Sequence, residues 1–208
     1  MSLNFIFQIK KTMMLPIYEA NINSFDTGIC ALSLVENPAT ESMLLCFDDD
    51  AQKPKPMKFS VANDEKRILT GLIMCADRPI YRRDDSGYEY FVLFKREVLE
   101  AMAERMLLFG TENVFNFYHN PEEPIGGMKC REIYFKDVER GINPKGFEDI
   151  EDGSMFGTFH VTNDEVWETV KNGTFGISLE GLFNYELIES AEDKLLSEIE
   201  EIIKKIAG

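Results

Sequence analysis

Hydrophobic and polar positions alternate most regularly between residues 171 and 182, which read K-N-G-T-F-G-I-S-L-E-G-L. Every second residue from Phe175 is apolar, and the positions between them hold a glycine, Ser178 and Glu180. A period of two is typical of a half-buried β-strand, with one face on the core and the other open. The sequence therefore predicts a strand that presents a hydroxyl and a carboxylate on its open face.

Shorter apolar stretches predict further short strands. They are expected at residues 15–20, 28–35, 43–47, 68–76, 88–94, 114–118, 128–138, 155–161 and 182–188. The turn residues R-R-D-D-S-G predict a hairpin between 68–76 and 88–94, and N-P-E-E-P-I-G-G after His119 predicts a rigid turn. Residues 48–67 predict a polar surface loop, the most mobile internal stretch, and residues 141–153 a second loop.

A period of three to four residues predicts three helices. The first covers residues 95–108 and ends at Gly110, and the second follows a capping box at 162–165 and buries Val166, Trp167 and Val170. The third begins at Ser190 and carries an apolar stripe whose spacing suits a partner helix. Together these elements predict an α+β fold: a mostly antiparallel β-barrel flanked by helices.

Three segments follow from these elements. Residues 1–14 are interpreted as an N-terminal extension, 15–189 as one β-barrel domain, and 190–208 as a C-terminal amphipathic helix.

Composition limits the classes of function. The formal net charge is -15 over 208 residues, which argues against a nucleic-acid groove. No apolar run has the length of a membrane span, and the N-terminus is a poor signal peptide. The four cysteines are widely spaced and the two histidines lack metal-ligand spacing, so neither a zinc site nor another cofactor is expected. The cysteines are interpreted as free thiols of a reducing compartment, mostly buried in strands.

The open face of the 171–182 strand raises the question of chemistry. A serine hydroxyl needs a base within hydrogen-bond reach to act as a nucleophile. His119 ends a predicted strand at a turn, where functional side chains are commonly exposed, whereas His160 lies inside a strand. Glu180 shares the face of Ser178, about 7 Å along the strand, and is a candidate to orient an imidazole. A turn histidine and a solvated carboxylate are the plainer interpretations.

The chain resembles the phage prohead (capsid maturation) serine proteases, in particular the XkdF-like branch. Four pieces between about Leu15 and Ile188 carry the resemblance. They are S-L-V-E-N-P-A at residues 33–39, G-L-I-M-C-A-D-R-P-I-Y-R at 71–82, H-N-P-E-E-P-I-G at 119–126, and N-D-E-V-W-E-T-V-K-N-G-T-F-G-I-S-L-E-G at 163–181. The last is the most specific, because it joins the Trp-containing helix to the serine strand.

The resemblance implies a herpesvirus-protease-like β-barrel with a histidine base upstream of a serine nucleophile, which matches His119 and Ser178. In many such proteases a strand resembling E-V-S-L-V-x-x-P-A follows the serine, whereas A-L-S-L-V-E-N-P-A lies near the N-terminus here. This order looks like a circular permutation of the barrel. The position that matches the acidic residue is Ala31. Glu180, Asp26 or His160 could replace it, or the site works as a dyad.

The leading hypothesis is therefore a serine endopeptidase that cleaves phage scaffold and major capsid proteins in the host cytoplasm, inside the immature capsid. It would act as a homo-oligomer, without nucleic acid, membrane or cofactor as a partner. Ser178 would be the nucleophile, His119 the base and Glu180 the orienting group. The alternative is a non-catalytic capsid-assembly or scaffold-like protein that keeps the protease fold, which the acidic charge and the coiled-coil-like last helix would suit.

Overall fold

The computed structural model describes residues 15–23, 27–36, 59–84, 86–171 and 175–188. Within these residues it contains twelve strands, two α-helices and one short 3₁₀-helix. Several predictions lie outside the described residues: the N-terminal extension, the strand at 43–47, most of the 48–67 loop and the C-terminal helix. They stay predictions.

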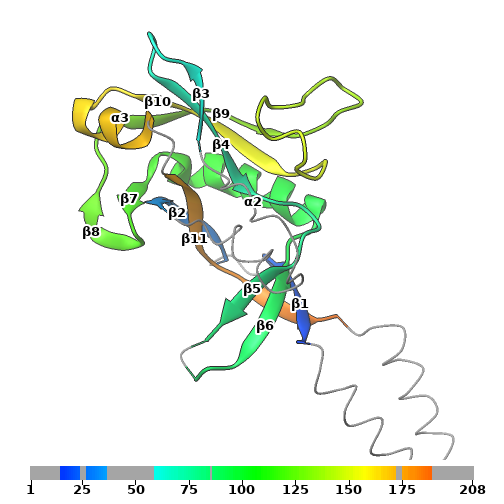
Figure 1. Ribbon diagram of the computed structural model, residues 1–208. Coiled ribbons are helices and arrows are strands. Elements are labelled where there is room, and N and C mark those ends of the chain that lie inside the picture. Colours follow the sequence, from blue (N-terminus) through cyan, green and yellow to red (C-terminus); the bar gives the residue numbers. More distant parts are fainter. Residues whose placement is uncertain (1–14, 24–26, 37–58, 85, 172–174, 189–208) are drawn as a thin grey trace, which may run out of the picture.

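Backbone ladders group the described strands into three four-stranded sheets, separated along the molecule in Figure 1. The first has the order β12 (Asn184–Leu187), β1 (Ile17–Asn21), β6 (Glu89–Leu93) and β5 (Ile80–Arg83). The second has the order β3 (Ser60–Asn63), β4 (Ile68–Met74), β10 (Met155–Val161) and β9 (Met128–Phe135). The third has the order β11 (Gly176–Leu182), β2 (Gly28–Val35), β7 (Phe115–Phe117) and β8 (Asn120–Pro124).

The α+β class with mostly antiparallel pairing is confirmed. Only β1 with β6 and β2 with β7 run parallel among the described pairs. The second and third sheets are joined where the Phe59 amide donates to the Phe175 carbonyl at 3.0 Å, next to β3 and β11. Closure of the strands into one barrel stays a prediction.

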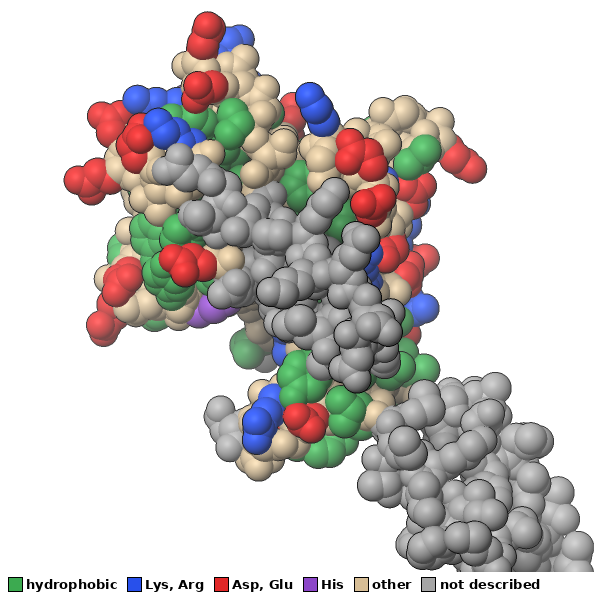
Figure 2. Space-filling view, viewed as in Figure 1, with side chains coloured by type: hydrophobic (Ala, Val, Ile, Leu, Met, Phe, Trp, Pro, Cys, Tyr) green, Lys and Arg blue, Asp and Glu red, His purple; other side chains and the backbone are tan. Residues whose placement is uncertain are grey.

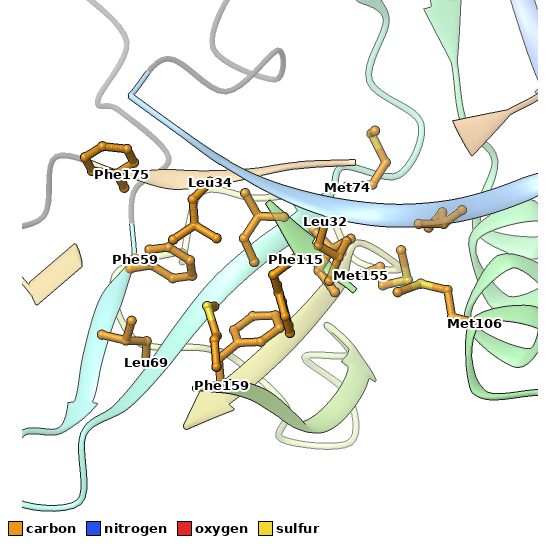
Figure 3. Close-up of a cluster of buried hydrophobic side chains, with 14 of the residues drawn as sticks. Leu32, Leu34, Phe59, Leu69, Met74, Met106, Phe115, Met155, Phe159 and Phe175 are labelled. Carbon is orange, nitrogen blue, oxygen red and sulfur yellow. The ribbon is translucent and has the colours of Figure 1, made fainter. Parts of the chain in front are cut away.

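Apolar side chains of the second and third sheets meet in one core, part of which is drawn in Figure 3. Leu32 and Leu34 of β2 and Ile177 of β11 supply the third sheet's share, and each is at most 2% exposed. Phe159 of β10 packs edge-on against Phe115 of β7, with ring centroids 5.8 Å apart. Burial of this face drives the third sheet onto the core, so the polar residues between these positions point the other way.

The two described helices agree with their patterns. Helix α2 (Arg96–Phe109) buries Leu99, Met102 and Met106 and ends at Gly110, whose φ of 73° lets its amide bond to the Met106 carbonyl. Helix α3 (Asp164–Lys171) buries Val166, Trp167 and Val170, as predicted.

The start of α3 corrects a detail of the sequence analysis. Asn163, and not Thr162, is the cap: its Oδ1 accepts from the amides of Glu165 at 2.9 Å and Val166 at 3.2 Å. The Thr162 hydroxyl instead donates to the Gly127 carbonyl at 3.0 Å.

Three predictions about loops are wrong in part. The hairpin that uses R-R-D-D-S-G joins β5 to β6, whereas β4 belongs to another sheet. Residues 60–63 of the predicted polar loop form β3, because they pair with β4. N-P-E-E-P forms β8 at the edge of the third sheet, where the missing N–H groups of two prolines are tolerated.

The loop after β9 is held by one buried lysine. Lys136 is 2% exposed, and its ammonium donates to the carbonyls of Phe147 at 3.1 Å, Glu148 at 2.7 Å and Ile150 at 2.6 Å. Phe147 then packs on Phe156 of β10 in a second, smaller core. The acidic loop predicted at 141–153 is thus a fixed cover over the second sheet.

The cysteines follow the prediction only partly. Cys30 and Cys130 are free thiols. Of the three described cysteines only Cys75 is buried, and Cys30 is exposed although it lies in β2. Burial raises the pKa of Cys75 to about 12 and that of Cys130 to about 11, so both are thiols at neutral pH. Cys46 lies outside the described residues.

Candidate functional site

A row of polar side chains crosses three strands of the third sheet on the face away from the core. Ser178 of β11 is directly opposite Ser33 of β2, and Ser33 is directly opposite Asn116 of β7. Partners in register point to the same face of a sheet, so the three side chains line up across β11, β2 and β7. All three residues are buried, with Ser33 at 0%, Asn116 at 4% and Ser178 at 8% exposed.

The turn between β7 and β8 brings His119 to this row. Phe117 pairs with Asn120, so Tyr118 and His119 are the two central residues of a hairpin turn, with φ of 52° and 60°. Two central residues with positive φ define the type I′ turn, which normally favours Asn-Gly. Each non-glycine residue in this conformation costs about 1–3 kcal/mol, and such strain clusters at functional sites.

The imidazole of His119 contacts two oxygen atoms through Nδ1. Ser33 Oγ is 3.1 Å from Nδ1, and Glu180 Oε1 is 3.4 Å from it. Two oxygens beside one ring nitrogen favour the tautomer with its proton on Nδ1. Nε2 then carries the lone pair and is the ring nitrogen able to accept a proton.

Three donors converge on one oxygen of Glu180. Asn116 Nδ2 donates to Oε1 at 2.6 Å, Ser33 Oγ makes a short hydrogen bond to it, and His119 lies alongside. Ser33 also donates to Asn116 Oδ1 at 2.7 Å. A hydroxyl has one proton, so these two donations of Ser33 are alternatives and the network has more than one proton arrangement.

These contacts keep Glu180 ionised. Burial is the largest single influence and raises the pKa of Glu180. Hydrogen bonds from Ser33 and Asn116 and the charge of His119 lower it, and together they outweigh burial, so the pKa lies below its ordinary value. Its side chain remains 23% exposed and that of His119 44% exposed. The cluster is therefore closed at Ser33 and open to solvent at the imidazole.

A β-bulge beside Glu180 helps to position its carboxylate. Glu180 pairs with Ala31 and the next residue, Gly181, pairs with Ile29, so Cys30 is the extra residue of the bulge. A Cβ at Gly181 would lie 2.4 Å from the Gly28 carbonyl oxygen, so only glycine allows the strands this close.

The predicted site residues are distributed as follows. His119 and Glu180 lie together, and Ser178 lies one strand from Ser33 in the same row. Among the described residues, the hydrogen bonds of His119 go to Ser33 and Glu180, so a bond from His119 to Ser178 stays a prediction. His160 lies in β10 of the second sheet, apart from this row. Asp26 lies outside the described residues.

The sequence analysis missed Ser33 and Asn116. Ser33 lies in an apolar run, A-L-S-L-V, and Asn116 between two phenylalanines, so each looked like a minor interruption of a strand. The available signal was that a polar residue inside a buried strand requires a partner. Which partner it has depends on the order of strands in the sheet.

Two features, a metal-ligand cluster and a membrane-spanning helix, are absent from the described residues. No group of three or more His, Cys, Asp or Glu residues there is placed to hold a metal ion. No helix in the same ranges is long and apolar enough to cross a membrane. Acidic side chains are spread over the face seen in Figure 2.

Comparison of the chain with protein-family models, with characterised proteins and with solved structures found no match.

Proposed function

We propose that this chain is a serine endopeptidase with Ser178 as nucleophile, His119 as general base and Glu180 as orienting carboxylate. The observation that carries the proposal is the contact of Glu180 Oε1 with His119 Nδ1 at 3.4 Å, beside the serine row. A carboxylate on Nδ1 holds the imidazole in the tautomer whose Nε2 accepts the nucleophile's proton.

The proposed reaction uses these three residues in turn. Ser178 Oγ attacks the peptide carbonyl and gives its proton to His119 Nε2. His119 then passes that proton to the leaving amine, the C–N bond breaks, and an acyl-enzyme on Ser178 remains. Water, deprotonated by the same nitrogen, releases the acid and restores the serine. Glu180 stays ionised throughout and stabilises the imidazolium.

Ser33 and Asn116 are the positioning residues of this mechanism. Their hydrogen bonds to Glu180 fix the carboxylate, and Ser33 also fixes the ring of His119. Ser33 is a weaker candidate for the nucleophile, because it is fully buried and contacts the same Nδ1 nitrogen that faces the carboxylate.

The resemblance to prohead proteases supports the same carboxylate. Its acidic position matches Ala31, and Ala31 lies directly opposite Glu180 in the β2–β11 ladder. A carboxylate on β11 would thus replace one on β2 at the same level of the sheet. On this resemblance, the fold is a permuted herpesvirus-protease-like barrel, and the substrates are phage scaffold and major capsid proteins inside the immature capsid in the host cytoplasm.

The test is labelling with a fluorophosphonate probe, followed by mass spectrometry to locate the modified serine. We expect the label on Ser178, and its loss in Ser178→Ala and His119→Ala variants whose thermal melting is unchanged. Cleavage of co-expressed scaffold should fall by roughly 10⁴- to 10⁶-fold in either variant, with the double variant scarcely worse, because the two residues act as a unit. Ser60→Ala, a serine on β3 outside the row, is the matched control.

A label on Ser33 would reassign the nucleophile and keep the peptidase. No label on any serine of the folded protein, with scaffold left intact, would reject the peptidase. That outcome would favour a non-catalytic capsid-assembly protein, because the direct bond from His119 to the buried Ser33 also suits a purely structural cluster.

A further inference from the structure

The second sheet carries a wide-open surface cavity of about 630 Å³ that is separate from the serine row. It lies where β4 and β10 meet the turn after β3, and His160 and Arg131 are part of its lining. His160 is directly opposite Ile68 of β4 and Lys129 of β9, so these three side chains share one face of the sheet.

The charge of this cavity is opposite to that of the whole chain. Lys66, Arg67 and Arg131 line it with one lining carboxylate, Glu65, while Asp164 pairs with Arg67 and reduces the local excess of positive charge. The His160 ring adds a further polar group. The chain as a whole has a net charge of -15. A local excess of cations on an acidic protein attracts anions to that place alone.

The cationic wall is held in position by the β3–β4 turn. The Arg67 amide donates to the Asp64 carbonyl at 3.0 Å, and the Lys66 amide donates to Asn63 Oδ1 at 2.8 Å. Arg67 has a φ of 52°, and its carbonyl accepts from the Val161 amide at 3.0 Å. The backbone of this turn is fixed by these bonds, so binding costs little backbone entropy there.

The guanidinium of Arg67 is oriented by two contacts that involve only one of its nitrogen atoms. Its Nη1 contacts Asp164 Oδ1 at 2.6 Å and the Thr162 carbonyl at 3.5 Å, whereas a guanidinium has five N–H donors. The Asp164 side chain is 83% exposed, so this ion pair is worth at most about 1 kcal/mol. A second carboxylate can therefore bind the same guanidinium.

We propose that this cavity binds an acidic peptide segment of a partner protein, with carboxylates on Arg67 and Arg131. Two guanidinium groups favour paired carboxylates because each can bind one in a bidentate manner. Nucleic acid is disfavoured, because it carries a charge at every nucleotide and continues beyond this short cationic wall, whereas the charge of a peptide can be confined to a short acidic segment. The proposal does not depend on the peptidase.

The probe is fluorescein-labelled hexaglutamate, and the measurement is fluorescence anisotropy with the full chain at low and high salt. We expect saturable binding that weakens with salt and that Arg131→Glu weakens by about tenfold or more. Arg67→Gln should weaken it as well. Arg140→Glu is the matched control, since Arg140 is 72% exposed and lies in the loop after β9, and it should bind as the unchanged protein does.

Arg131 is exposed, so Arg131→Glu should leave the fold intact. Its effect on binding therefore tests the proposal even if Arg67→Gln lowers the melting temperature. Equal affinity of the Arg131 and Arg140 variants would overturn the proposal, and so would absence of hexaglutamate binding. Binding of inorganic phosphate without hexaglutamate binding would show a site for small anions and would also overturn it.

Discussion

Lys136 and Ser33 are both buried polar residues with three hydrogen-bond partners, but the two clusters differ in how their donors are matched. The ammonium of Lys136 has three donors and meets three carbonyl oxygens of one loop. The hydroxyl of Ser33 has one donor and meets Asn116 Oδ1, Glu180 Oε1 and His119 Nδ1, which come from separate segments.

The difference separates a structural cluster from a chemical one. A fully matched cluster has one favoured arrangement, and its effect is to fix the loop on the second sheet. In the second cluster the single proton of Ser33 can go to either Asn116 or Glu180, so there is more than one arrangement, and the imidazole reaches solvent. Substitutions in the first cluster should therefore lower stability, and substitutions in the second should lower activity.

The largest effect on stability is expected for Lys136→Met. The substitution leaves one buried and two partly buried carbonyls without their donor. A buried unsatisfied group costs about 1–3 kcal/mol and a partly buried one less, so the free energy of unfolding should fall by about 2 kcal/mol or more. Chemical denaturation measures it, with Lys129→Met on an exposed position of β9 as the control. A loss below about 1 kcal/mol would contradict the structural role of Lys136.

Ser33→Ala should act mainly on activity. A hydrogen bond to a charged group contributes about 1.5–3 kcal/mol, so loss of this positioning bond should slow fluorophosphonate labelling of Ser178 about tenfold to hundredfold. Ser33→Thr keeps the hydroxyl and should recover part of the rate. An unchanged labelling rate in Ser33→Ala would show that the cluster does not position the base.

Variants of His119 test whether the turn carries strain. Both His119→Ala and His119→Gly lose the base, but glycine accepts a φ of 60° without a Cβ clash. The glycine variant should therefore be more stable than the alanine variant by about 1 kcal/mol, measured by denaturation.

His160 provides the matched control, since it lies inside β10. There glycine should be the less stable of the two by about 0.5–1 kcal/mol. The same order at both positions would contradict the type I′ turn.

The smallest effect concerns pH. The pKa of Glu180 in the folded protein lies below its ordinary value of 4.5, so its contribution to stability is present above that value. It is lost as the pH falls through the lower, folded pKa. The melting temperature of the unchanged protein should thus fall over that acidic window more than that of Glu180→Gln. Parallel pH profiles of the two proteins would contradict the network around Glu180.

Local patterns in the sequence determined most of the elements. Apolar stretches predicted the bounds of β2 and β10 to the residue, and the apolar positions of α2 and α3 identified their buried faces. These features depend on burial of one face of a single segment, and the residues of that segment alone carry the pattern.

The same patterns failed where pairing outweighed composition. β8 forms from a proline-rich stretch because β7 offers it an edge, and β3 forms from a polar one because it pairs with β4. Neither partner is visible from the strand's own residues, because strand pairing is a long-range contact.

The site divides in the same way. The sequence by itself determined that Ser178 and Glu180 share a face and that His119 lies at the turn after a strand, since both follow from local patterns. Only the tertiary structure decided that Ser33 and Asn116 lie beside them, because the order β11, β2, β7 brings together residues far apart in the chain. Hydrogen bonds act over about 3 Å, so the partners of a buried hydroxyl are set by strand order and register, not by distance along the sequence.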